Sequence, residues 1–124
     1  MTQTLAIAAG GAIGALFRFW VSTGVYAMLG RGFPYGTLAV NVIGSFLMGF
    51  LFVVLNERMV ASPELRAALL IGLLGAFTTF STFSMETLNL IEQAAYTKAL
   101  ANMILSVLLC VAAAWVGLII GRQI

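Results

Sequence analysis

A run of hydroxyl and phenyl side chains is the part of this sequence with the most obvious chemical capacity. Between residues 78 and 84, five side chains are threonine or serine and two are phenylalanine, and the run interrupts a hydrophobic segment. A hydroxyl can donate or accept a hydrogen bond, and a phenyl ring has a negative face and a positive edge. These groups could bind a small ion, or the rings could pack in the core while the hydroxyls bond within the helix.

Side chains suited to covalent chemistry are scarce. The sequence has no histidine and one cysteine, Cys110. The single cysteine excludes an intrachain disulfide and a cysteine cluster. The absence of histidine excludes an imidazole group as a general base or as a metal ligand. The chain is not expected to be an enzyme. Its basic residues are scattered, with a net charge of +2, and do not indicate binding to nucleic acid.

The composition indicates a membrane protein. Hydrophobic residues make up 62% of the 124 positions and charged residues 8%, whereas a soluble domain has about 25% charged residues. The hydrophobic segments predict an all-α fold of four transmembrane helices, at about residues 4–29, 37–55, 65–93 and 98–121. They form one domain over residues 1–124. Ser62, Pro63 and Glu64 predict the amino end of the third helix.

The third segment has two possible conformations around residues 78–84. The hydroxyls surround the helix, so each could bond the carbonyl one turn back within a continuous helix. Alternatively the helix is broken, since Gly72 and Gly75 lower helix preference just before the run. Breaks at membrane depth mark binding sites in transport proteins. Free carbonyls from Gly75 to Thr78 would suit Na⁺, and free amides would suit a small anion.

Polar and small residues recur four positions apart, which places them on one face of a helix. Helix packing and a polar ion route both explain such faces. Arg18 and Glu86 are the only charges deep enough in the segments to need partners, in a polar vestibule or in an ion pair. The three faces comprise Gly10, Gly14, Arg18 and Ser22; Thr37, Asn41, Ser45 and Gly49; and Asn102, Ser106 and Cys110.

The basic residues give a weak signal for membrane orientation. Arg58, Arg66 and Arg122 fall on one side of the predicted membrane, and Arg31 and Lys98 fall on the other. Orientation normally follows an excess of lysine and arginine in cytoplasmic loops. Because the two sides differ by one residue, we expect the chain to insert both ways and to pair antiparallel with its own copy.

Three motifs together resemble the CrcB/Fluc family of fluoride channels. Residues 75–84, GAFTTFSTFS, with Glu86 are similar to the third-helix signature of that family. Residues 10–15, GGAIGA, with Arg18 resemble its first-helix motif. Residues 36–41, GTLAVN, with Gly44 resemble its second-helix motif. The resemblance covers the whole chain in length and in the order of its segments.

The resemblance implies a fluoride-specific channel that exports fluoride passively from the bacterial cytoplasm. It implies an antiparallel homodimer in the inner membrane, with two pores and one central Na⁺. Backbone carbonyls of Gly75 and Thr78 would hold the Na⁺, and Arg18 and Glu86 would act electrostatically near a vestibule. The implied fluoride pathway consists of Phe80, Phe83, Asn41, Thr37, Thr79, Ser81, Thr82, Ser84 and Ser106.

Two other functions are also considered. A small dual-topology, proton-coupled drug exporter also has four helices, and Glu86 is the one acid that could carry its proton. A structural subunit of a larger complex would use the same small-residue faces for helix packing alone. The residues by themselves do not separate fluoride from chloride, so that choice rests on the resemblance.

Overall fold

The computed structural model describes residues 1–124, and every regular element in it is helical. Two short segments are π-helical, with wider turns than an α-helix. The elements in chain order are α1 (Thr2–Leu29), α2 (Tyr35–Val53), η1 (Val54–Arg58), α3 (Pro63–Arg66), η2 (Ala67–Leu73), α4 (Leu74–Phe77), α5 (Phe80–Glu92) and α6 (Tyr96–Gln123).

These elements form four spans that are long and apolar enough to cross a membrane. The spans are Thr2–Leu29, Tyr35–Arg58, Pro63–Glu92 and Tyr96–Gln123. The second joins α2 to η1, and the third joins α3, η2, α4 and α5. The predicted all-α class and the four transmembrane helices are therefore confirmed.

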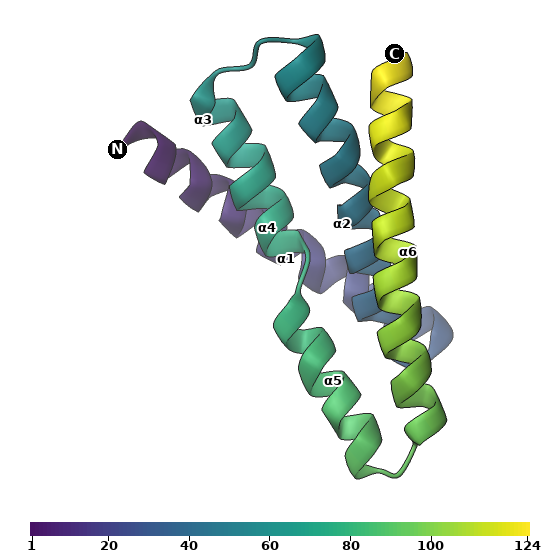
Figure 1. Ribbon diagram of the computed structural model, residues 1–124. Helices are drawn as coiled ribbons and strands as arrows, with labels where there is room; N and C mark the ends of the chain where they lie inside the picture. The colour runs from purple at the N-terminus through teal and green to yellow at the C-terminus, as the bar shows by residue number, and fades with distance from the viewer.

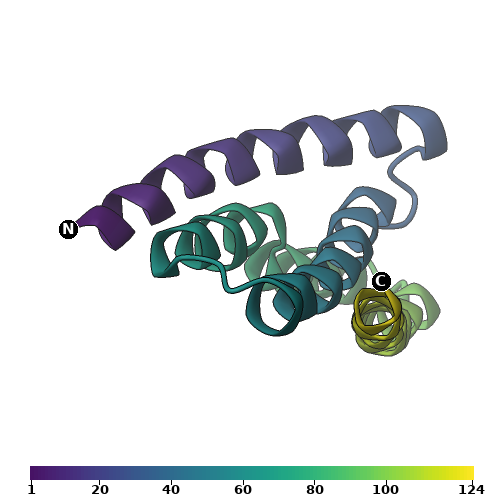
Figure 2. The same cartoon turned by 90° about the horizontal axis from the view of Figure 1, so that it is seen from above.

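Three of the spans form the body of the molecule, and α1 crosses them. In Figure 1, α2 and α6 lie side by side, while the third span descends from α3 through α4 to α5. The view from above in Figure 2 shows α1 running along one side of the other helices. It packs mainly on η2, α2 and α4. In Figure 1, α5 and the beginning of α6 lie at one end of the molecule, where their short connection joins them, and α6 then runs to the opposite end.

Glycines allow α1 to approach the third span closely. Gly10 faces the carbonyl of Ala68 and Gly14 faces the carbonyl of Leu73, so a Cβ atom at either position would collide with backbone. Both glycines are buried. The prediction that this face of the first helix is a packing surface is confirmed for these two residues.

Glycines also allow α2 and α6 to pack closely together. Gly49 of α2 faces the carbonyl of Ala114, and Gly117 of α6 faces the carbonyl of Phe46. The two backbones can therefore lie in contact without intervening side chains. This close pair fixes one wall of the site described below.

The third span begins with a cap. Ser62 Oγ accepts a hydrogen bond of 3.1 Å from the amide of Leu65, and Pro63 is the first residue of α3. The proline has no amide hydrogen to leave unpaired at that position. The helix start predicted from Ser62 and Pro63 is confirmed.

The regular helix of the third span ends at Phe77 and resumes at Phe80. Thr78 (φ −91°, ψ 159°) and Thr79 (φ −152°, ψ 120°) have extended backbone between α4 and α5. Figure 1 shows this connection as a narrow link between two coils. The Thr78 hydroxyl donates to the carbonyl of Leu74 at 2.9 Å, one turn back. The Thr79 hydroxyl instead caps α5 by accepting from the amide of Thr82 at 3.2 Å.

Large apolar side chains cover the outside of the protein. Phe19, Trp20, Leu108 and Trp115 are each more than half exposed. Exposing so much apolar surface to water would be unfavourable, because the hydrophobic effect favours removing apolar area from water. The exterior suits lipid or another chain.

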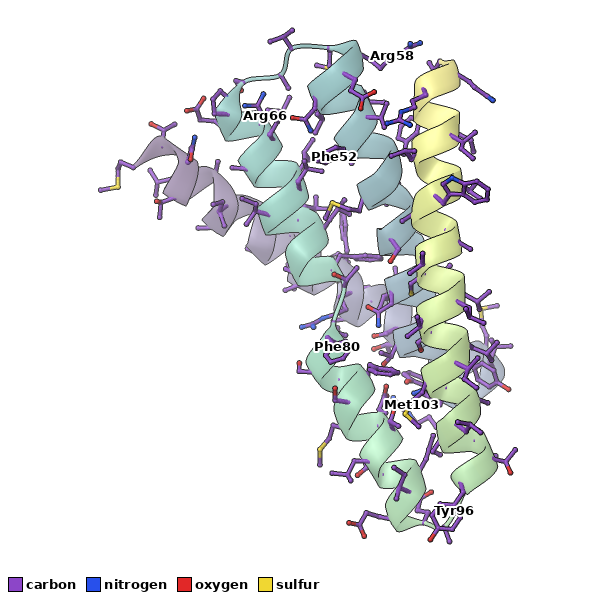
Figure 3. All side chains as sticks on the ribbon, viewed as in Figure 1. Phe52, Arg58, Arg66, Phe80, Tyr96 and Met103 are labelled. Carbon is purple, nitrogen blue, oxygen red and sulfur yellow. The ribbon has the colours of Figure 1, made fainter.

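Apart from Arg18 within α1, the basic side chains lie at the two ends of the bundle. Arg122 Nε lies 3.5 Å from Glu57 Oε1, which joins the end of α6 to η1. Figure 3 shows Arg58 and Arg66 at this end and Tyr96 at the other. At that other end, Lys98 Nζ donates to the carbonyl of Gly32 at 3.1 Å.

Candidate functional site

A groove of about 410 Å³ lies beside the connection between α4 and α5. Its walls come from α2, α5, α6 and the extended residues of the connection. Most of its lining is apolar, with a few polar groups, as in many small-ligand sites. Five of the residues predicted for the fluoride pathway line it: Asn41, Thr79, Phe80, Phe83 and Ser106.

Asn41 connects α2 to the interrupted third span. Its Nδ2 donates to the carbonyl of Thr79 at 3.0 Å, and its Oδ1 accepts from the amide of Thr79 at 2.8 Å. The carboxamide thus pairs with the backbone of a residue that has left the helix. This pairing satisfies two polar groups that would be costly to leave unpaired in an apolar environment.

Phe80 and Phe83 place two rings on the wall of the groove. Their centroids are 5.2 Å apart and their planes are inclined by 44°. The spacing of three residues predicts that the rings share a face of the helix, and the structure confirms this. The Phe80 side chain is 77% exposed, and Figure 3 shows it at the start of α5. Its ring has little contact within its own chain, so packing alone does not account for it.

The opposite wall belongs to α2 and α6. Ser106 is buried, and its hydroxyl donates to Asn102 Oδ1 at 3.3 Å. Ser45 and Cys110 also line the groove. The sequence predicts only that they lie on helix faces, through their spacing of four from Asn41 and from Ser106.

The remaining hydroxyls of α5 lie outside the groove. Ser81, Thr82 and Ser84 are exposed on the surface of the chain. Thr82 Oγ1 accepts from the Thr79 hydroxyl at 3.1 Å, and Ser84 Oγ donates to the carbonyl of Phe80 at 3.0 Å. Ser81 Oγ lies 3.3 Å from the Thr79 hydroxyl. Ser81 and Thr82 therefore lie within reach of the Thr79 hydroxyl at the edge of the groove, whereas Ser84 bonds only within α5.

Thr37 and Glu86 belong to a second polar cluster. Tyr26 Oη donates to Glu86 Oε2 at 2.6 Å and lies 3.3 Å from the Thr37 hydroxyl. Glu86 Oε1 is buried and has no hydrogen-bond partner. The Arg31 guanidinium lies 4.4 Å from the centre of the Tyr26 ring, where a cation is attracted to the ring face.

This cluster borders a polar pocket of about 290 Å³ near the turn after α1. Arg31, Glu86 and Lys98 contribute charges to its lining. The sequence motifs do not single out Tyr26, although its spacing of four from Ser22 continues the polar face of the first helix.

Arg18 and Glu86 do not form an ion pair. Arg18 is half-buried, and its guanidinium makes no hydrogen bond or ion pair within the chain. Glu86 instead accepts its hydrogen bond from Tyr26. The two deep charges therefore have separate surroundings.

Two backbone carbonyls near the interruption lack their usual helical hydrogen-bond donors. The carbonyl of Thr78 accepts no hydrogen bond. The two usual helical donors to Gly75 are the amides of Thr78 and Thr79, and they donate to Leu74 O and to Asn41 Oδ1. No cluster of three histidine, cysteine or acidic side chains offers a competing metal site. Carbonyl oxygens are suitable ligands for a hard cation.

The CrcB-like protein family (Camphor Resistance, CrcB) matches residues 5–118 of this chain. A protein named "Fluoride-specific ion channel FluC" from Methylococcus capsulatus is 60% identical over 119 residues. That alignment covers 96% of this chain and 52% of the relative, so the chain spans about half of that protein.

Two further relatives with the same printed name match over nearly their whole length. The Magnetococcus marinus protein is 56% identical over 118 residues, which are 95% of this chain and 96% of the relative. The Geobacter sulfurreducens protein is 49% identical over 124 residues, which are all of both chains. The family match and these alignments show that the chain belongs to the CrcB-like family.

Proposed function

We propose that this chain is a fluoride-specific ion channel in which the groove beside the broken third span forms part of the ion path. The observation that carries the proposal is the convergence of Asn41, Thr79, Phe80, Phe83 and Ser106 on one groove. Full-length relatives named as fluoride-specific channels support the choice of ion.

The groove is suited to an anion that must bind weakly and leave quickly. Its polar groups are neutral hydroxyls and a carboxamide, and its two rings can turn their positive edges toward an anion. Fluoride is small and strongly hydrated, so such contacts would replace part of its water shell. Several weak sites in series allow an ion both to enter and to leave.

Passive movement is favoured over proton coupling. No acidic side chain lines the groove. Glu86, the acid considered for a proton-coupled exporter, borders the other pocket and accepts a hydrogen bond from Tyr26. A proton carrier for drug transport would need to face the substrate, so we place Glu86 and Arg18 in an electrostatic role near a vestibule.

We further propose that two copies pair in antiparallel orientation to complete the channel. In the single chain the groove is open to the surface, and Phe80 and Gly75 are exposed beside it. A second copy would cover these residues and turn each groove into a pore, giving two pores. The bias of three basic residues against two between the ends supports insertion in both orientations.

A Na⁺ ion would bind at the centre of this dimer. The carbonyls of Gly75 and Thr78 would provide its ligands, because their usual helical donors are engaged elsewhere or absent. The ion would compensate the carbonyls left free where the third span is broken at mid-membrane depth. Its role would be structural.

In the cell, the channel would lie in the bacterial inner membrane and lower cytoplasmic fluoride. A test is growth of a bacterium that lacks its own fluoride exporter. Expression of this chain should restore growth at fluoride concentrations that stop the parent strain, and an equally expressed Asn41→Asp variant should not. Equal growth of the two strains, or no rescue by the natural sequence, would contradict the proposal.

A further inference from the structure

A chain of three hydrogen bonds joins α5 to α6 beneath the groove. The Thr87 hydroxyl donates to the carbonyl of Phe83 at 2.8 Å, and Asn102 Nδ2 donates to Thr87 Oγ1 at 2.9 Å. At the far end, Ser106 Oγ donates to Asn102 Oδ1 at 3.3 Å. Asn102 is 1% exposed and Thr87 is 6% exposed, so water does not compete for these groups.

The Phe83 carbonyl fixes the donor and the acceptor in each of these three hydrogen bonds. The Phe83 carbonyl can only accept, so the hydroxyl proton of Thr87 must point to it. Thr87 Oγ1 must then accept the next bond, and only the Nδ2 side of Asn102 can donate it. Asn102 therefore presents Oδ1 to Ser106, and the hydroxyl proton of Ser106 must point to Asn102.

This orientation of the Ser106 hydroxyl affects the groove, because Ser106 lines its wall. With its proton held by Asn102, Ser106 presents oxygen lone pairs toward the groove, which disfavours an anion. We infer that Asn102 is a positioning residue that competes with the transported anion for the Ser106 proton. The inference rests on the proposed channel function and adds a determinant of anion affinity outside the groove, because Asn102 does not line it.

The bond that would have to break is the weakest of the three. Its length of 3.3 Å exceeds the usual 2.7–2.8 Å for a hydroxyl donor, whereas the other two bonds are close to ideal. A serine hydroxyl rotates about a single bond, so its proton can turn into the groove without moving the backbone. Thr87 and Asn102 would remain in place during this rotation.

The main test is current through the purified full chain in planar bilayers, measured against fluoride concentration. Asn102→Leu retains the approximate shape of the side chain and releases the Ser106 proton. We expect half-maximal current at about fivefold lower fluoride, the ratio equivalent to one net hydrogen bond of about 1 kcal/mol. In a Ser106→Ala background the same change should have no effect on this concentration.

Thr87 provides a second variant that does not touch Ser106. Thr87→Val removes the hydroxyl that fixes the direction of the chain, so the Asn102 amide can turn and donate to Ser106. It should lower the half-maximal concentration as Asn102→Leu does, while Thr87→Ser, which retains the hydroxyl, should match the natural protein. A purely structural role predicts no dependence on Ser106 and no difference in affinity between the two Thr87 variants.

The outcomes separate the inference from the function on which it rests. If the natural protein conducts no fluoride, the proposed function fails first. If it conducts fluoride but the effect of Asn102→Leu persists without Ser106, or Thr87→Val leaves the affinity unchanged, the positioning role is refuted alone. Should Asn102→Leu not fold, the Thr87 pair decides the question.

Discussion

The Asn41 side chain and the Thr79 backbone pair through two hydrogen bonds, in which each residue donates once and accepts once. The carboxamide of Asn41 thus acts as a substitute peptide group for the point where the third span leaves its helix. Its polar atoms are occupied within the chain even though the residue lines the groove. Asn41 therefore has both a structural and an ion-facing role in our proposal.

Asn41→Leu should destabilise the protein, because it leaves the amide and carbonyl of Thr79 without partners. Leaving a buried polar group unsatisfied costs about 1–3 kcal/mol. Thermal unfolding in detergent should show this loss. Asn41→Asp retains an acceptor for the Thr79 amide but places a negative charge in the groove, so fluoride flux should stop for electrostatic reasons. Fluoride flux through Asn41→Asp at the natural rate would exclude the groove as the path.

Phe80→Ile should suppress fluoride flux and leave the fold intact. The ring is 77% exposed, so its removal costs little packing within the chain, while the aromatic edge is lost. Phe83→Ile should also suppress flux, with a larger loss of stability because Phe83 is half-buried. The measurement is liposome flux beside size-exclusion profiles. Normal flux in both variants would contradict the hypothesis that the edges of the two rings attract the anion.

Gly14→Ala should loosen the contact of α1 with the third span. The new methyl group would meet the carbonyl of Leu73, and overpacking of this kind costs about 1–3 kcal/mol. Gly24→Ala is the matched control on the same helix, since nothing lies near its Cβ position. The control should be neutral or slightly stabilising, because alanine favours a helix over glycine. Equal unfolding temperatures for the two variants would contradict the observed packing.

Tyr26→Phe should destabilise the chain through Glu86. The Tyr26 hydroxyl is the one hydrogen-bond donor to that carboxylate, whose other oxygen already has no partner. We expect a loss of about 1–3 kcal/mol, and a smaller loss when Tyr26→Phe is made in a Glu86→Gln background. A double-mutant cycle in unfolding free energy measures this coupling.

The Glu86→Gln variant also separates passive from proton-coupled transport. In a passive channel, fluoride flux should persist in this variant and should not need a proton gradient. Loss of a proton-driven uptake activity in Glu86→Gln would instead favour the exporter hypothesis.

Replacing Na⁺ should weaken the dimer if carbonyls at the interruption bind it. With Na⁺ exchanged for N-methylglucamine, the proposed dimer should unfold or dissociate at a lower temperature. Gly75→Ala should do the same in Na⁺, although within its own chain a Cβ at Gly75 would meet only the carbonyl oxygen of Leu70, at an ordinary contact distance of 4.0 Å. Gly24→Ala again provides the control for an added methyl group. Identical dimer stability in the two salts would contradict the proposed Na⁺ site.

The sequence predicts the helical architecture well, because it depends on long apolar segments and local capping. The four spans and the Ser62 cap follow from residue types alone. The small-residue faces also indicate where backbones meet, as Gly10 and Gly49 show. These features are local or periodic, so they are visible in one chain.

The partners of individual polar groups could not be predicted in the same way. The pairing of Asn41 with Thr79 joins residues 38 positions apart, and the pairing of Tyr26 with Glu86 joins residues 60 apart. Such contacts depend on how the spans cross. For the same reason, the sequence does not decide whether Arg18 and Glu86 form an ion pair, whereas in the structure Glu86 accepts a hydrogen bond from Tyr26.

Fluoride efflux from liposomes that contain only the purified protein tests the central claim most directly. Vesicles loaded with fluoride should empty rapidly once a K⁺ ionophore balances charge, and vesicles loaded with chloride should retain it. Phe80→Ile vesicles with the same protein content should release fluoride far more slowly. Retention of fluoride by the natural protein, or equal release of fluoride and chloride, would contradict the account.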